Sequence, residues 1–270
     1  GKLLEQGNAY KCFCTSEELD AMRKQARETK EALKYDGRCR KLSETETAER
    51  EAKGMPFALR FKVPAGTTEF DDLIRGRISF DNVELDDFII LRSDGTPTYN
   101  FSVSVDDESM RISHVIRGED HISNTPKQIQ LLRAMGVEPP QYAHVSLILG
   151  EDGARLSKRH GATAVGAYAD QGYLPEALFN FLALLGWSPK DDREILSREQ
   201  ILGEFELSGV VKTAAIFNPK KLEWMNGQYV RMLSDQELAA RIGPFLLKAG
   251  FLNEEQLNTR PEWLVQLARA

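Results

Sequence analysis

The apolar pattern between residues 114 and 149 constrains the fold of this chain more than any other feature. His114–Arg117 predicts a short strand, and Asn124-Thr125-Pro126 predicts the start of a helix with proline in its first turn. The buried side of that helix carries Ile129, Leu132 and Met135. Ala143–Leu149 is an apolar run suited to a strand of a parallel sheet. Strand, helix and strand make a βαβ unit, which predicts half of a nucleotide-binding α/β fold.

The segments on either side of this unit have different patterns. Before it, the alternation of apolar residues over 57–63 predicts a strand, and a capping box at Thr15–Glu18 predicts a helix. The first hundred residues are therefore expected to be α+β. Beyond about residue 160 every element is expected to be helical. Helix starts are predicted at Pro175, Ser197, Asn218, Ser234, Asn253 and Pro261.

Composition limits the class of protein. The chain of 270 residues is 41% hydrophobic and has a net charge of −6, which suits a globular protein with a sizeable core. No apolar run is long enough to cross a membrane. The acidic mean does not exclude a nucleic-acid partner, because binding depends on the charge of one face. Three cysteines within the first forty residues argue against a disulfide framework, so we expect a reducing, cytoplasmic setting.

The most specific segment follows the turn at 150–153. It runs Arg155-Leu156-Ser157-Lys158-Arg159-His160-Gly161, just past a predicted parallel strand. Open α/β sheets bind their ligands at this position. Three cations and a serine within five residues suit an anionic ligand such as a triphosphate. The alternative is a solvated basic loop with no ligand.

This segment resembles the second signature of class I aminoacyl-tRNA synthetases, the mobile lysine-serine-lysine loop. Its form, Leu-Ser-Lys-Arg-His-Gly, is that of bacterial glutamyl-tRNA synthetases. Other segments match the same family in order and spacing. They are 97–101, 105–107, 114–121 through Pro126, 172–177, 185–188 and 217–222. The resemblance extends from about residue 1 to 235.

The resemblance implies roles for individual residues. Lys158 is expected to be catalytic, contacting the ATP phosphates and stabilising the charge that develops as pyrophosphate leaves. The expected ATP-binding residues are Arg155, Leu156, Ser157, Lys158, Arg159, Glu119, Asp120 and His121. Tyr99, Arg117 and Val103 are expected to bind glutamate, with the planar guanidinium of Arg117 on a carboxylate. The alternatives are a core tyrosine at 99, a salt-bridged arginine at 117 and helix-capping acids at 119 and 120.

The cysteines leave two readings open. Cys12-x-Cys14 and Cys39 resemble the zinc knuckle in the acceptor-binding insertion of this family. Common members add a histidine two residues after the last cysteine, where this chain has Lys41, which favours a lapsed site. A related synthetase-like family instead uses a tyrosine four residues before the cysteine, where Tyr35 stands. Tetrahedral zinc needs four ligands, so either Tyr35 completes the site or the thiols are free.

The first class I signature, His-x-Gly-His, does not occur in the chain. We therefore expect the first half of the nucleotide fold to precede Gly1, and this piece alone to be inactive. The expected fold is α/β, the second half of a Rossmann-like class I catalytic domain. Its expected parts are an acceptor-binding insertion at 1–98, the Rossmann-like half at 99–153, a helical stem-contact domain at 154–234 and the start of a helical anticodon-binding domain at 235–270.

The resemblance implies a glutamate–tRNA ligase. Such an enzyme activates L-glutamate with ATP and Mg²⁺ and transfers it to tRNA(Glu), as a monomer and without a membrane partner. A glutaminyl enzyme carries a different loop from Leu156-Ser157-Lys158. The glutamyl-queuosine tRNA(Asp) synthetase lacks the helices expected after residue 234. A non-catalytic tRNA-binding module on the same fold is the alternative from another class.

Overall fold

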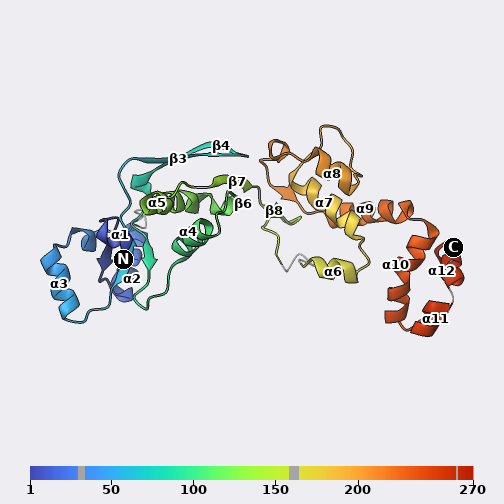
Figure 1. Cartoon of the computed structure of the whole chain (residues 1–270), viewed down its shortest axis with the longest axis horizontal. Coiled ribbons are helices and arrows are strands. Elements are labelled where there is room, and N and C mark those ends of the chain that lie inside the picture. Colours follow the sequence, from blue (N-terminus) through green and yellow to red (C-terminus); the bar gives the residue numbers. More distant parts are fainter. Residues whose placement is uncertain (30–33, 158–163, 260, 270) are drawn as a thin grey trace. The chain divides into compact units, whose positions relative to one another are not determined.

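The computed structural model describes residues 1–29, 34–157, 164–259 and 261–269 (Figure 1). They form two compact units, Gly1–Val145 and Ser146–Ala270. No helix in these ranges is both long and apolar enough to cross a membrane. The division of the sequence into four domains stays a prediction.

The first unit contains two small sheets and several helices. Its helices are α1 (Lys2–Glu5), α2 (Ser16–Thr29), η1 (Arg38–Lys41), α3 (Glu44–Ala52), η2 (Asn82–Glu84), α4 (Tyr99–Ser109), η3 (Glu119–Asn124) and α5 (Thr125–Met135). Its strands are β1 (Ala9–Cys12), β2 (Ala58–Phe61), β3 (Thr67–Asp72), β4 (Gly76–Asp81), β5 (Ile89–Leu91), β6 (His114–Gly118) and β7 (Gln141–Val145).

The sheet nearest the N-terminus has the antiparallel order β1-β2-β5. The strand predicted over 57–63 is confirmed as β2, but its burial does not alternate, because the neighbours Arg60 and Phe61 are buried on opposite faces. Phe61 is only 2% exposed and packs with Ile90 and Leu131 in one core cluster. The strand β1 ends at Cys12, so this sheet also places the first cysteines.

The second sheet has the order β4-β3-β7-β6. Strands β6 and β7 are parallel, with His114 opposite Gln141, and α5 connects them. The predicted βαβ unit is confirmed. Helix α5 ends at Met135 and is capped by Gly136, whose φ of 82° is the left-handed conformation that glycine adopts without strain.

Two predictions about strands in this region were wrong. The apolar run Ala143–Leu149 is not one strand, because β7 ends at Val145 and Ile148–Leu149 (β8) joins a different sheet. Strand β3 was not predicted. Its sequence, Thr67–Asp72, is polar and acidic, and its pairing with β4 and β7 holds it extended.

The second unit is almost entirely helical. Its elements are β8 (Ile148–Leu149), α6 (Val165–Asp170), α7 (Pro175–Gly186), α8 (Arg198–Glu204), η5 (Leu207–Gly209), β9 (Ala215–Ile216), α9 (Pro219–Met232), α10 (Asp235–Lys248), α11 (Glu254–Thr259) and α12 (Pro261–Arg269). Helices α8 and α10 begin with complete capping boxes at Ser197 and Ser234, as predicted. Asn218 caps α9.

One element of this unit differs from the all-helical prediction. Strand β9 pairs in parallel with β8, and Phe217 N donates to Leu149 O over 2.8 Å. Phe217 itself packs with Phe181 and Leu222 in the core of α7 and α9. The pairing therefore attaches the chain that follows β8 to the helical core.

Candidate functional site

Tyr99 and Val103 lie one turn apart on α4. Tyr99 is the first residue of the helix and is 52% exposed, so it is not the core tyrosine of the alternative reading. Its hydroxyl lies 3.2 Å from His121 Nδ1 in η3. Val103 is half-buried on the same helix. Tyr99 and His121, both predicted site residues, are thus in direct contact.

Arg117 lies near the end of β6 and is held by two neighbours. Its Nε donates to His144 Nε2 over 3.2 Å, and its Nη2 donates to Thr125 Oγ1 over 2.8 Å. The guanidinium carbon lies 5.6 Å from the ring centroid of Tyr142. Arg117 forms no ion pair with any described carboxylate, so the salt-bridged alternative is wrong for the described residues. Within the described residues its polar contacts are thus with uncharged partners, His144 and Thr125.

Thr125 links the Tyr99–His121 contact to Arg117. Its hydroxyl, which accepts from Arg117, lies 3.3 Å from the carbonyl oxygen of His121. Tyr99, His121 and Arg117 therefore meet at the carboxyl end of β6, the end at which α/β sheets bind ligands.

The two acidic residues after β6 differ in their surroundings. Glu119 Oε2 forms an ion pair with Arg75 Nη2 over 2.5 Å. Asp120 is exposed in η3. Their expected ribose contact stays a prediction.

The predicted phosphate loop follows β8 in the second unit. Gly150 N donates to Ala154 O over 2.8 Å, and Gly153 has a φ of 73°, so the chain reverses in a tight turn. Leu156 N then donates to Ile148 O over 2.9 Å, and the Leu156 side chain packs against the core cluster of Phe217. Arg155 and Ser157 are exposed beside this anchor. Lys158 and Arg159 lie outside the described residues.

The cysteines and Tyr35 converge in the first unit. The Sγ atoms of Cys12, Cys14 and Cys39 all lie within 4.8 Å of one another. The Tyr35 hydroxyl oxygen lies 3.5 Å from Cys12 Sγ and 3.6 Å from Cys14 Sγ, and it accepts from Cys39 N over 3.1 Å. Four donor atoms thus lie close together, and four is the number of ligands that a structural zinc takes.

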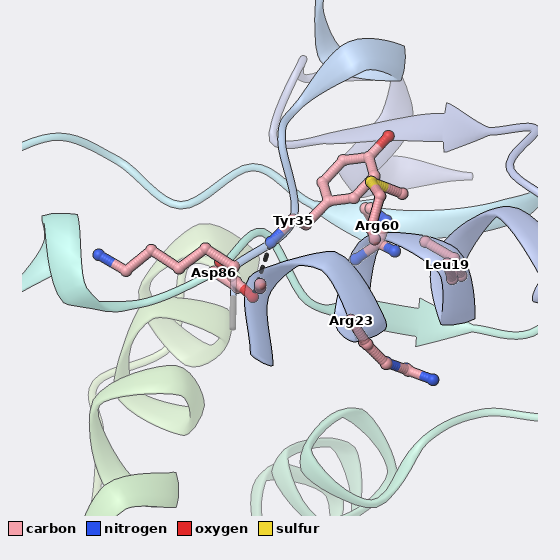
Figure 2. Close-up of a pocket in the computed structure, with 8 residues that line it drawn as sticks. Leu19, Arg23, Tyr35, Arg60 and Asp86 are labelled. Atoms are coloured by element: carbon pink, nitrogen blue, oxygen red, sulfur yellow. Dashed lines mark hydrogen bonds between the residues drawn. The ribbon is translucent and has the colours of Figure 1, made fainter. Parts of the chain in front are cut away.

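A buried arginine adjoins this thiol cluster, defined as Cys12, Cys14, Cys39 and Tyr35. Arg60 is only 6% exposed, and its Nε donates to Cys12 Sγ over 3.2 Å. Its guanidinium lies 3.8 Å from the centroid of the Tyr35 ring, and Figure 2 shows the two residues stacked at one pocket. Hydrogen bonding from Cys39, and further from Tyr35 and Arg60, lowers the pKa of Cys12 to about 4 despite its burial. Cys12 therefore favours the thiolate, the form that binds metal, whereas burial raises the pKa of Cys14, and the hydrogen bond with Cys12 raises that of Cys39.

The backbone of Tyr35 is fixed as well. Its N–H donates to Asp86 Oδ2 over 3.0 Å, the contact drawn as a dashed line in Figure 2. Lys41, at the position of the usual histidine, is exposed at the end of η1. The side chain beside Cys12 and Cys14 is thus Tyr35, whose hydroxyl contacts both sulfur atoms.

Two buried residues behind Arg117 were not among the residues predicted from the sequence. Asp72 and His144 are 4% and 0% exposed, and Asp72 Oδ2 lies 2.6 Å from His144 Nδ1. A histidine inside an apolar strand was the available signal, since a buried histidine needs partners on both ring nitrogens. The partner Asp72 lies in the strand that was not predicted.

Comparison with known proteins gives the class. The family model described as tRNA synthetases class I (E and Q), catalytic domain, matches residues 1–224. The chain belongs to this family of class I synthetase catalytic domains, and the expected fold class is confirmed.

Curated relatives narrow the family to one kind of synthetase. Glutamate–tRNA ligases of Thermodesulfovibrio yellowstonii and Aquifex aeolicus are 52% and 53% identical to it, over 94% and 93% of this chain. The chain spans about half the length of these relatives, 53% and 54%. A crystal structure of a glutamate tRNA ligase from Elizabethkingia meningosepticum, in complex with its amino acid, matches with a TM-score of 0.82 at 34% identity. That match covers 94% of this chain and 56% of the other. The resemblance to bacterial glutamyl-tRNA synthetases is confirmed.

Proposed function

We propose that the protein containing this chain is a glutamate–tRNA ligase, which activates L-glutamate with ATP and transfers it to tRNA(Glu). The observation that supports this most strongly is the guanidinium of Arg117, held at the carboxyl end of a parallel strand and unpaired with any described carboxylate. The relatives of this chain are named glutamate–tRNA ligases, and they extend over roughly twice its length.

Arg117 would bind a carboxylate of glutamate. A planar guanidinium suits bidentate carboxylate recognition, and its contacts with His144 and Thr125 limit its freedom before the ligand arrives. Tyr99 and Val103 would form the wall of the amino-acid pocket, because both lie on α4 and the Tyr99 hydroxyl reaches η3.

The loop after β8 would handle ATP. Its base is anchored by Leu156, which packs against the core of the second unit and so holds Arg155 and Ser157 at a fixed place after β8. Lys158 would stabilise the charge on the leaving pyrophosphate, aided by Arg155, Ser157 and Arg159. Glu119, Asp120 and His121 would meet the nucleoside. Mg²⁺ would accompany the phosphates.

Aminoacylation by the full-length protein tests this function. We expect glutamate to be attached to tRNA(Glu) in an ATP-dependent reaction, while the piece of residues 1–270 alone has no activity. Transfer only to the modified base of tRNA(Asp) would support the glutamyl-queuosine alternative. Binding of tRNA without any activation of glutamate would support the non-catalytic module.

We also propose that Cys12, Cys14, Cys39 and Tyr35 hold one zinc ion. The three sulfur atoms and the Tyr35 oxygen lie close together, and the buried cation Arg60 would offset the negative charge of such a ligand set. The zinc would pin β1 to η1 and so stabilise the N-terminal knuckle directly. Elemental analysis of protein purified without chelators should find one zinc per chain, whereas a lapsed site would yield none.

A further inference from the structure

Asp72 and His144 form a buried pair between β3 and β7. Both side chains are inaccessible to solvent, and the Nδ1–Oδ2 distance is 2.6 Å. The rings of Phe70 and Tyr142 lie beside the imidazole, with centroids 6.3 Å and 6.2 Å away. The pair is therefore enclosed by aromatic rings on the strands that carry it.

The carboxylate of Asp72 is fixed by the backbone. Its Oδ1 accepts from the N–H groups of Ile74, Arg75 and His144, at 3.0, 2.9 and 3.3 Å. Only Oδ2 faces the imidazole. Burial raises the pKa of Asp72, but the N–H groups and His144 outweigh it and hold that pKa below its usual value. Asp72 is thus an ionised acceptor with a defined orientation.

The neighbours of His144 define its tautomer. Arg117 Nε can only donate, so His144 Nε2 must accept and the ring proton must lie on Nδ1, facing Asp72. Burial lowers the pKa of His144, and the nearby Arg117 and Arg75 lower it too, outweighing the opposite effect of Asp72. The imidazole is therefore neutral and offers a lone pair to Arg117.

We propose that Asp72 and His144 are positioning residues that orient Arg117 for recognition of the glutamate substrate. This inference rests on the proposed function, which assigns a glutamate carboxylate to Arg117. Asp72 sets the tautomer of His144, His144 Nε2 holds Arg117 Nε, and Thr125 holds Arg117 Nη2. Within the described residues Arg117 Nη1 makes no hydrogen bond, so it is available to a ligand.

A purely structural role would not require this arrangement. Three backbone N–H groups already tie Asp72 Oδ1 to its surroundings, including His144 N in β7. These backbone contacts join β3 to β7 whichever ring nitrogen of His144 carries the proton. The contact with Arg117 does need a particular tautomer, because the N–H of Arg117 requires a lone pair on Nε2; Thr125 Oγ1, 3.1 Å from the same nitrogen, can pair with either tautomer.

The substitution Asp72→Asn separates the two roles. The Asn Oδ1 keeps the three N–H donors, so its NH₂ group must face His144 Nδ1. That nitrogen then becomes the acceptor, and the proton moves to Nε2, where it opposes the N–H of Arg117. We expect the KM for glutamate in tRNA charging by the full-length enzyme to rise about tenfold to a hundredfold, the scale of a misplaced binding group. The KM for ATP should stay within about twofold, and the preference for glutamate over glutamine should fall.

Matched variants complete the test. His144→Gln can retain an acceptor towards Arg117, so it should keep a lower glutamate KM than His144→Leu, which cannot. Thr68→Val removes a buried hydroxyl on the same strand, bonded to Asn82 and Gln130, and should leave the glutamate KM unchanged.

The outcomes are distinct. A folded Asp72→Asn enzyme with unchanged glutamate KM overturns the inference, as does an equal rise in the KM of glutamate and ATP. If Asp72→Asn does not fold, equal glutamate KM values for His144→Gln and His144→Leu overturn it instead. Charging by the wild-type enzyme tests the proposed function separately, because only the ratio of variant to wild type bears on Asp72 and His144.

Discussion

Replacing Tyr35 with phenylalanine removes a single oxygen from the thiol cluster. The ring can keep its stacking on Arg60 at 3.8 Å, so the packing should survive. The hydroxyl contacts Cys12 Sγ, Cys14 Sγ and Cys39 N, and all three lose that partner. The substitution therefore tests whether the Tyr35 oxygen is the fourth zinc ligand, with the packing of the ring kept.

The expected loss can be worked from the ligand count. A structural zinc with four ligands binds with about 10–16 kcal/mol, which is about 2.5–4 kcal/mol for each ligand if shared equally. That share corresponds to a loss of about 60-fold to 700-fold in zinc affinity. Water can take the open position, so we expect about 100-fold.

Competition with a chromogenic zinc chelator measures the affinity. Tyr10→Phe is the matched control, because its hydroxyl donates to Asp87 Oδ2 over 2.7 Å and touches none of the sulfur atoms. The control should bind zinc as the wild type does. Wild-type affinity in Tyr35→Phe would refute the assignment of Tyr35 as a ligand.

Three further outcomes are expected. Lys158→Ala in the full-length enzyme should lower the activation rate by about 100-fold or more, measured by pyrophosphate exchange, with much less effect on tRNA binding. Near-normal exchange would remove it from the catalytic residues. Asn180→Ala should destabilise the second unit by about 2–3 kcal/mol in urea unfolding. The buried N–H of Leu196 loses its acceptor, and the hydroxyl of Tyr229 loses one of its two acceptors. A loss below about 0.5 kcal/mol would contradict this accounting. The lowered pKa of Asp72 means that the unfolded chain binds its proton first as pH falls. Its contribution to stability is complete above its unfolded pKa and is lost as pH falls through the folded pKa, so Asp72→Asn should unfold with a shallower acid dependence below about pH 4. An unchanged slope would argue against an ionised Asp72.

Local patterns predicted much of the secondary structure from the sequence alone. The helix starts at Ser197, Asn218 and Ser234 are set by side chains that bond to backbone N–H groups three residues away. Such contacts depend on neighbouring residues only, so the sequence contains them. The βαβ unit around α5 was predictable for a similar reason, because its apolar periodicity and its proline lie within one short segment.

The candidate site was predictable in part. Resemblance indicated Tyr99, His121 and Arg117, and the structure brings them to one end of β6. The pair that holds Arg117 was not predictable, because Asp72 and His144 lie 72 residues apart and meet only when β3 joins the sheet. No local pattern records a pairing between strands that distant in the chain.

The same limit applies to the elements that the sequence analysis missed. Strand β9 has two residues, and its pairing with β8, not its composition, makes it extended. The sequence left open whether Tyr35 completes the cysteine set or Lys41 marks a lapsed site. Tertiary structure brings the Tyr35 oxygen to the sulfur atoms, with the ring stacked on Arg60 and the backbone N–H bonded to Asp86. The sequence by itself determined which local elements form and which donor groups are present, while long-range pairing decided which of those groups meet.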